Sequence, residues 1–230
     1  EIGRVYWYDS IEEKAPKSIL TIGRSDSILS LQSIAIHHFS TRWWDEVYNY
    51  SFTNEVLDAK VWYHDQDDAV IVKNAFNQEY THMRRSLLPR LALNISENIK
   101  YRKNLTFFEV GKCSWKKWNS VEETKFIAGI STEYSLEKMR DDIESYLTHT
   151  MGNSCIEVKQ EWALPFLHPN ACGIYTLNGV SVWHFGRIHP VTATEFDIPE
   201  DTLYFELALE PLVDAYNESE IVFREIGKYQ

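Results

Sequence analysis

Residues 72–111 constrain the fold of this chain more than any other stretch. A polar linker leads into the pair Arg84-Arg85 and the run SLLP at residues 86–89, and the stretch ends in the run FEVG at residues 108–111. Leucine and isoleucine recur between the two runs at helical spacing, and a proline in the first helical turn costs little because its missing N–H would have no partner there. The stretch therefore predicts a helix over residues 86–101 that is followed closely by a strand.

Periodicity predicts further elements on both sides of this stretch. Helical spacing predicts a helix within residues 27–44, capped by Asp26 or Ser27, and another over residues 136–151 that ends at Gly152. The dipeptide Asn178-Gly179 is a strong hairpin signal. Strands are expected at residues 47–52, 70–72, 105–113, 125–130, 156–158, 173–177, 181–188 and 203–209, with a short helix at residues 210–216. This order predicts an α+β fold, in which an antiparallel sheet of about six strands is flanked by helices.

Composition excludes several classes of protein. The 230 residues carry a net charge of −11, which argues against a broad nucleic-acid-binding surface, although a local basic patch stays possible. The three cysteines form no CxxC pair, which gives no zinc signature and suits a reduced, cytoplasmic protein. No apolar run is long enough to span a membrane, and no glycine-rich phosphate loop is present.

The order of several short motifs resembles the β subunit of phenylalanyl-tRNA synthetase. An asparagine-led linker, the SLLP helix and the FEVG strand are followed by LHPNAC at residues 167–172, by NG at residues 178–179 and by GRIHP at residues 186–190. The run LYFEL at residues 203–207 completes the pattern, and the resemblance extends over residues 2–229. It implies a class II aminoacyl-tRNA synthetase-like fold.

The same resemblance implies a division of the chain. Residues 1–24 would be the tail of a preceding helix-turn-helix-like module and a linker, and residues 25–220 the non-catalytic class II synthetase-like core. Residues 221–230 would lead into a C-terminal anticodon-binding domain. Because the chain starts at Glu1 and stops at Gln230, we expect a fragment of a longer, divergent protein.

Two arginines that hold ATP in class II synthetases have no counterpart here. The resemblance places the first at Trp115 and the second at Pro211, while Glu206 and Ala208 fill two glycine positions of the same late motif. Arginine is needed at such positions because its planar fork pairs bidentately with phosphate. Removing one such donor costs roughly 3–4 kcal/mol of transition-state stabilisation. We therefore expect no catalytic residue, no cofactor-binding residue and no metal ligand in this chain.

The resemblance also implies partners. It implies an α subunit that holds ATP, Mg²⁺ and phenylalanine, an (αβ)₂ assembly, and contact with tRNA through the whole assembly. The helix at residues 86–101 carries a mostly polar flank, with Asn94, Glu97 and Asn98 as candidate subunit-interface residues. No enzymatic activity is expected of the chain by itself.

Other candidates have a structural interpretation beside the functional one. Lys116, Lys117 and Trp118 form a basic–aromatic cluster that is a candidate tRNA contact, or else an exposed hairpin loop. The remaining candidates are more typical of structural roles. Arg84-Arg85 suggest a solvated helix face or a salt bridge, Glu109 an ion pair or a cap, His37-His38 packing, His168-Pro169 and His189-Pro190 turns, and residues 65–68 a solvated acidic loop.

Two rival functions remain. The chain could be a stand-alone paralogue that binds protein or RNA without an α subunit. It could also be a repurposed class II-like ligase, which would need a basic ATP site built from other residues.

Overall fold

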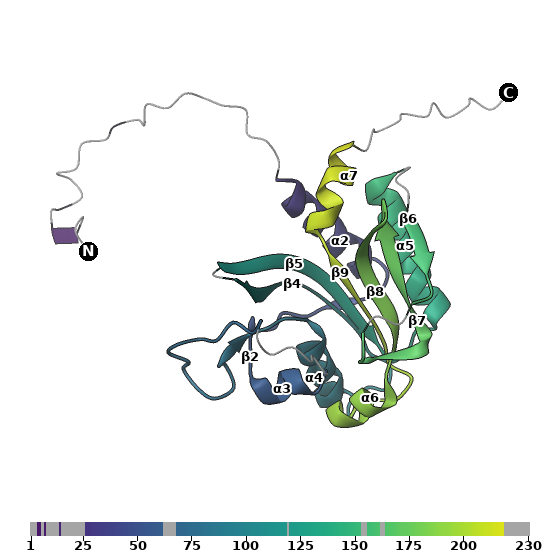
Figure 1. Cartoon of the computed structure of the whole chain (residues 1–230), viewed down its shortest axis with the longest axis horizontal. Coiled ribbons are helices and arrows are strands. Elements are labelled where there is room, and N and C mark those ends of the chain that lie inside the picture. Colours follow the sequence, from purple (N-terminus) through teal and green to yellow (C-terminus); the bar gives the residue numbers. More distant parts are fainter. Residues whose placement is uncertain are drawn as a thin grey trace.

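The computed structural model describes residues 26–61, 68–118, 120–152, 156–161 and 164–218, together with residues 4, 5, 7 and 14 (Figure 1). The helices are α2 (Ser27–Ser40), α3 (Glu55–Ala59), α4 (Leu88–Asn98), α5 (Leu136–Met151), α6 (Pro190–Phe196), the 3-10 turn η2 (Glu210–Leu212) and α7 (Val213–Glu218). The strands are β1 (Asp45–Glu46), β2 (Phe52–Thr53), β3 (His82–Met83), β4 (Thr106–Lys117), β5 (Ser120–Ser131), β6 (Ile156–Lys159), β7 (Leu167–Leu177), β8 (Val180–Ile188) and β9 (Leu203–Ala208).

Seven of these strands form one sheet in the order β1-β4-β5-β9-β8-β7-β6. All neighbours pair antiparallel except β1 and β4, which are parallel. The α+β fold with a large antiparallel sheet is confirmed, with one strand more than the expected six. Strands β4 and β9 both run antiparallel to β5, so they point the same way.

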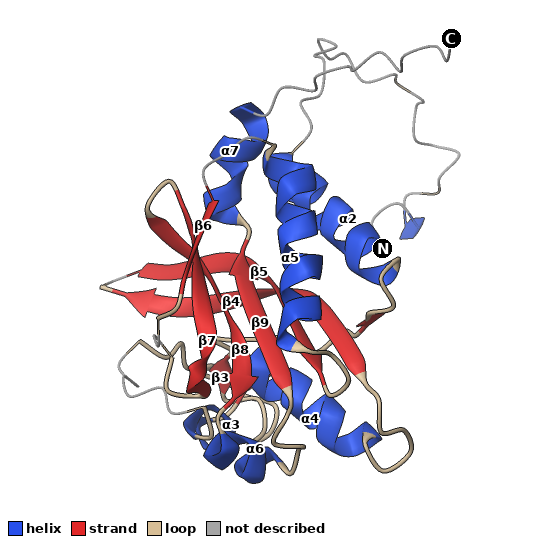
Figure 2. Cartoon of the chain, turned by 90° about the vertical axis from the view of Figure 1, so that its right-hand side faces the viewer, coloured by secondary structure: helices blue, strands red, loops and turns tan. Residues whose placement is uncertain are grey.

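Helices cover both faces of the sheet, as Figure 2 shows. One core cluster joins α2, α5 and α7 to the sheet, and we call this side the α5 face; it includes Phe39, Tyr146 and Phe205. The second cluster joins α3, α4 and α6 to the opposite side, which we call the α4 face; it includes Leu91 and Phe107. Alternate residues of each strand point to opposite faces, so neighbouring residues of one strand belong to different cores.

Local sequence explains where the main helices begin and end. Asp26 accepts a hydrogen bond from the N–H of Ile28 and caps α2, and Ser135 does the same for α5 through the N–H of Lys138. Helix α5 ends at Gly152, which has a φ of 57°. Asn178 and Gly179 have φ values of 50° and 82°, so the predicted tight turn joins β7 to β8. These four boundaries agree with the sequence analysis.

Several expected bounds were wrong. Residues 47–51 form no strand, and residues 70–72 contribute a single bridge from Ile71 to His82. Helix α4 is shorter than residues 86–101: it starts at Leu88, after the Ser86 side chain and the Leu87 N–H have bonded to Glu206 of the sheet, and it ends at Asn98. The β4–β5 hairpin is much longer than predicted: its strands extend to Lys117 and start again at Ser120, where a loop was expected.

The predicted terminal modules at residues 1–24 and 221–230 lie almost wholly outside the described residues, so the division stays a prediction. Within the described part of the chain, no helix is both long and apolar enough to cross a membrane.

Candidate functional site

The α4 face carries an unusual set of buried polar side chains where α4 meets the sheet. Glu206 of β9 points towards the start of this helix and accepts hydrogen bonds from Ser86 Oγ at 2.8 Å and from the Leu87 N–H at 2.9 Å. Burial raises the pKa of the Glu206 carboxyl, and these hydrogen bonds partly offset the rise. The carboxylate therefore satisfies backbone and side-chain donors that begin α4.

Arg84 forms the second part of this set. Its Nη1 donates to Glu109 Oε1 at 2.6 Å and its Nε donates to the Lys112 carbonyl oxygen at 3.0 Å. Arg84 is 3% exposed and Glu109 is 1% exposed, so the pair is fully internal. Gly111 makes room for the guanidinium, because a Cβ at this position would lie 2.0 Å from Arg84 Nη2. The Arg84-Arg85 pair and the run FEVG at residues 108–111 are thus joined by the ion pair between Arg84 and Glu109.

Arg85 is held in the same way. Its Nε lies 3.4 Å from Asp58 Oδ2 in α3, and its Nη1 lies 2.5 Å from Asp68 Oδ1. Burial raises the pKa of the Asp58 carboxyl, and the adjacent Arg85 opposes that rise. The expected salt bridge is confirmed for both arginines, whereas the expected solvated face is wrong, because Arg85 is also 3% exposed.

The two positions assigned to lost ATP arginines lie towards the same end of the sheet. Trp115 lies four residues beyond Gly111 on β4, and Pro211 lies just beyond the end of β9, in η2. The indole of Trp115 packs edge-to-face on Phe126, with ring centres 5.6 Å apart. Phe126 is also the register partner of Ala208 on β9. Neither position offers a cation to a phosphate.

The candidate tRNA contact lies at the tip of the β4–β5 hairpin. Trp118 is 91% exposed in the turn, and Lys116 and Lys117 are the exposed last residues of β4. Lys117 Nζ lies 3.0 Å from Glu122 Oε1, so a carboxylate of the opposite strand balances its charge. The cluster is therefore less basic than the sequence alone suggests.

The candidate interface residues lie on the outer side of α4. Glu97 and Asn98 are exposed and Asn94 is half-buried, while Leu91, Ala92 and Ile95 face the core. Asn98 Nδ2 donates to the Asn94 carbonyl oxygen at 2.8 Å, within the same helix. Glu97 also lines a groove between α3 and α4.

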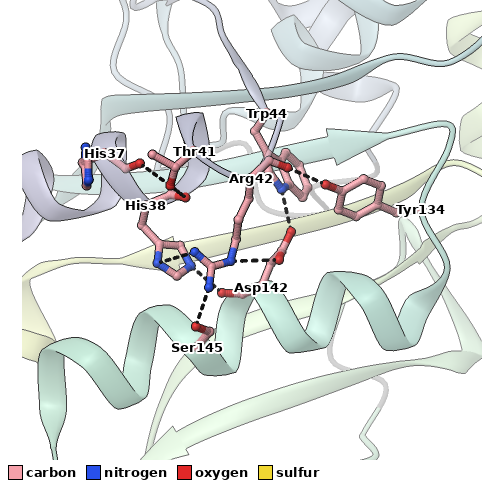
Figure 3. Close-up of polar contacts among 8 residues, drawn as sticks. All are labelled: His37, His38, Thr41, Arg42, Trp44, Tyr134, Asp142 and Ser145. Atoms are coloured by element: carbon pink, nitrogen blue, oxygen red, sulfur yellow. Dashed lines mark hydrogen bonds and ion pairs between the residues drawn. The ribbon is translucent and has the colours of Figure 1, made fainter.

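A second polar cluster joins α2 to α5 on the other face of the sheet (Figure 3). Asp142 is its centre: Oδ2 accepts from Trp44 Nε1 at 2.9 Å, Oδ1 lies 3.2 Å from Arg42 Nε, and its carbonyl oxygen lies 2.9 Å from His38 Nε2. Arg42 also donates to Ser145 Oγ at 2.7 Å. His38 is buried, as expected for packing, and the cluster fastens the end of α2 to α5.

The remaining candidates have structural roles in the part of the chain that is described. His168 lies inside β7 and not in a turn, and His189 caps α6; the two rings lie 6.4 Å apart. Each accepts a backbone N–H at Nδ1, and the described residues include no group of three metal-ligating side chains. Asp68 is ion-paired with Arg85, while residues 65–67 lie outside the described residues.

Sequence reasoning missed the roles of Glu206 and Asp142. In the sequence, Glu206 stands at a glycine position of the late motif, and its place inside the apolar run LYFEL is the signal for a buried cap. Asp142 lies in the predicted helix over residues 136–151, beside polar neighbours, and nothing in the spacing distinguishes it from a solvated residue.

Comparison with known proteins places this architecture in a family. The family model described as the phenylalanyl tRNA synthetase beta chain CLM domain matches residues 11–209. The chain is 26% identical over 230 residues to the phenylalanine–tRNA ligase beta subunit of Wolbachia sp. subsp. Brugia malayi, covering 91% of this chain and 27% of that protein. The corresponding subunit of Listeria innocua is 25% identical over 248 residues, covering 100% of this chain and 30% of that protein. The chain therefore spans less than a third of the length of these relatives.

A solved structure has the same fold. Pyrrolysyl-tRNA synthetase from Desulfitobacterium hafniense superposes with a TM-score of 0.67 at 14% identity, over 81% of this chain and 65% of that chain. The sheet and its flanking helices thus have the class II-like synthetase fold. The match of the family model over residues 11–209 shows that the chain belongs to the phenylalanyl tRNA synthetase beta chain CLM domain family.

Proposed function

We propose that this chain is the non-catalytic structural core of a phenylalanyl-tRNA synthetase β subunit. In this role it supports assembly with an α subunit, in a cytoplasmic (αβ)₂ heterotetramer that makes phenylalanyl-tRNA. ATP, Mg²⁺ and phenylalanine are held by the α subunit, and tRNA is bound by the assembly as a whole.

One observation carries the proposal: Arg84 and Arg85, the two buried arginines of the α4 face, are both held in internal ion pairs. Arg84 is paired with Glu109, and Arg85 with Asp58 and Asp68. Phosphate binding needs a guanidinium that is free to pair with the ligand, and extracting a buried arginine would leave a buried carboxylate uncompensated. Trp115 and Pro211 add no replacement cation at the end of the sheet.

The polar flank of α4 supports the assembly role. Glu97 and Asn98 are exposed, whereas the opposite side of the helix is packed in the α4 face core. A surface of this kind can meet a partner helix without unpacking the core.

The experiment uses the full-length β subunit that contains this chain. Asn94→Lys/Asn98→Lys is compared with wild type for association with the α subunit and for aminoacylation by the reconstituted assembly. The proposal predicts that wild type assembles and that the double variant assembles more weakly, while the circular dichroism of the two proteins is equal. A matched control, Gln160→Lys/Asn170→Lys, adds the same two charges at exposed residues outside α4 and should assemble like wild type.

Three outcomes count against the proposal. Absence of a wild-type complex favours the stand-alone paralogue, and amino-acid activation by the chain alone favours the repurposed ligase. Unchanged association of the double variant removes the α4 flank from the interface.

A further inference from the structure

An open groove of about 820 Å³ lies between α3, α4 and residues 78–82. Its wall is partly apolar: Val56 is 73% exposed and Leu93 is half-buried. These two side chains give the groove an apolar surface on which the apolar face of a partner segment can pack.

The basic side chains of the groove are already engaged within the chain. Lys60 Nζ donates to the Glu195 carbonyl oxygen at 2.7 Å and lies 5.1 Å from the centre of the Phe196 ring. Arg90 Nη2 donates to the Phe52 carbonyl oxygen at 3.1 Å, and its guanidinium carbon lies 5.7 Å from the centre of the Tyr80 ring. Both cations therefore face the walls of the groove.

The acidic side chains of the groove are not engaged in this way. Glu55, Glu79 and Glu97 are exposed, they come from three separate elements, and none forms an ion pair with any described residue. In contrast, the exposed carboxylates of Glu122 and Glu123 on the β4–β5 hairpin are each paired with a lysine. The groove thus carries three exposed glutamates without an ion pair, and its two cations, Lys60 and Arg90, are held at its walls by backbone carbonyl groups.

We propose that this groove binds a basic amphipathic segment of the partner subunit, with lysine or arginine side chains facing the three glutamates and apolar side chains resting on Val56 and Leu93. The inference rests on the proposed function, since it assigns the α4 flank at Glu97 to the same interface. Complementary charge at such a rim speeds association and fixes its register, and its contribution falls with increasing salt.

The test reverses charge at the groove in the full-length β subunit. Glu79→Lys/Glu97→Lys is compared with a control, Glu133→Lys/Glu200→Lys, which makes the same change in net charge at two exposed sites outside the groove. We expect the groove variant to bind the α subunit about tenfold more weakly than the control at low salt, and the difference to shrink at high salt. Circular dichroism and thermal melting establish that both variants are folded.

Failure of this inference is distinct from failure of the proposed function. If wild type forms no complex with the α subunit, the proposed function fails. If wild type forms the complex and both variants bind it equally at every salt concentration, the groove assignment is overturned. If the groove variant changes only the self-association of the chain, the occupant is a second copy of this chain, which also overturns the proposal.

Discussion

Where they contact the strands, the two faces of the sheet bury different side chains; the polar cluster of Asp142 on the α5 face joins two helices, α2 and α5. On the α5 face, Phe39 stacks on Phe205 with ring centres 5.3 Å apart, and Trp44 meets the same ring edge-on at 5.4 Å. On the α4 face, the ion pair of Arg84 and Glu109 lies under α4. Apolar packing stabilises without partners, whereas a buried charge is tolerated only when it is paired. On the α4 face, the buried arginines Arg84 and Arg85 are each paired with carboxylates of the same chain.

Two glycines on neighbouring strands make the same contrast. Gly111 leaves room for the guanidinium of Arg84, and a Cβ at Gly129 would lie 2.3 Å from Phe205 and 2.5 Å from Trp44. Each glycine therefore admits the group that defines its face: a charge on one side of the sheet and aromatic rings on the other.

The largest expected effect on stability comes from removing one partner of the buried ion pair between Arg84 and Glu109. Arg84→Ala leaves Glu109 buried and uncompensated, so we expect the free energy of unfolding to fall by about 3–5 kcal/mol. Urea denaturation followed by circular dichroism measures this change. Arg84→Met combined with Glu109→Leu removes both charges and should recover most of the loss. If the double variant is as unstable as the single one, the pair is not the reason for the loss.

The next largest effect on stability is expected from substituting Gly111 or Gly129 with alanine. Gly111→Ala and Gly129→Ala should each lower the free energy of unfolding by about 1–3 kcal/mol, because both force a neighbour to move. They differ in signature: Gly129→Ala should change the near-ultraviolet circular dichroism, since it displaces Trp44 and Phe205, while Gly111→Ala should leave that spectrum unchanged. Equal spectral changes in both variants would contradict the assignment of Gly111 to the charged side chains and of Gly129 to the aromatic ones.

The sequence predicted the elements that depend on local signals. The cap at Asp26, the bounds of α5 at Leu136 and Gly152 and the turn at Asn178-Gly179 are set by neighbouring residues, and they appear where expected. The length of the β4–β5 hairpin could not be predicted, because exposed lysines of β4 form ion pairs with glutamates of β5, and a pairing between two strands leaves no local pattern in the sequence. The burial of Arg84 and Arg85 also depends on carboxylates distant in sequence, so no local pattern reveals it.

The smallest effect concerns pH on the α5 face. Burial, reinforced by the charge of Arg42, lowers the pKa of His38 below 6.5, although its hydrogen bond to Asp142 opposes the shift. The folded state therefore binds this proton less readily than the unfolded state, and stability is lost as pH falls through 6.5 towards the lowered value. His184, whose pKa is lowered by burial, adds to the same loss.

His38→Gln should reduce this pH dependence, and the exposed neighbour variant His37→Gln should retain it. Urea midpoints at about pH 7.5 and about pH 5.5 compare the three proteins. A wild-type slope that His38→Gln leaves unchanged would assign the effect to other groups.

The proposed non-catalytic role requires that the α4 face does not bind ATP. Calorimetric titration of the chain with ATP and Mg²⁺, alongside pyrophosphate exchange with phenylalanine, tests this claim directly. We predict no binding heat beyond dilution and no exchange above the blank, because Arg84 and Arg85 are held by internal carboxylates and Trp115 and Pro211 supply no cation. Micromolar ATP binding, or exchange above the blank, would contradict it.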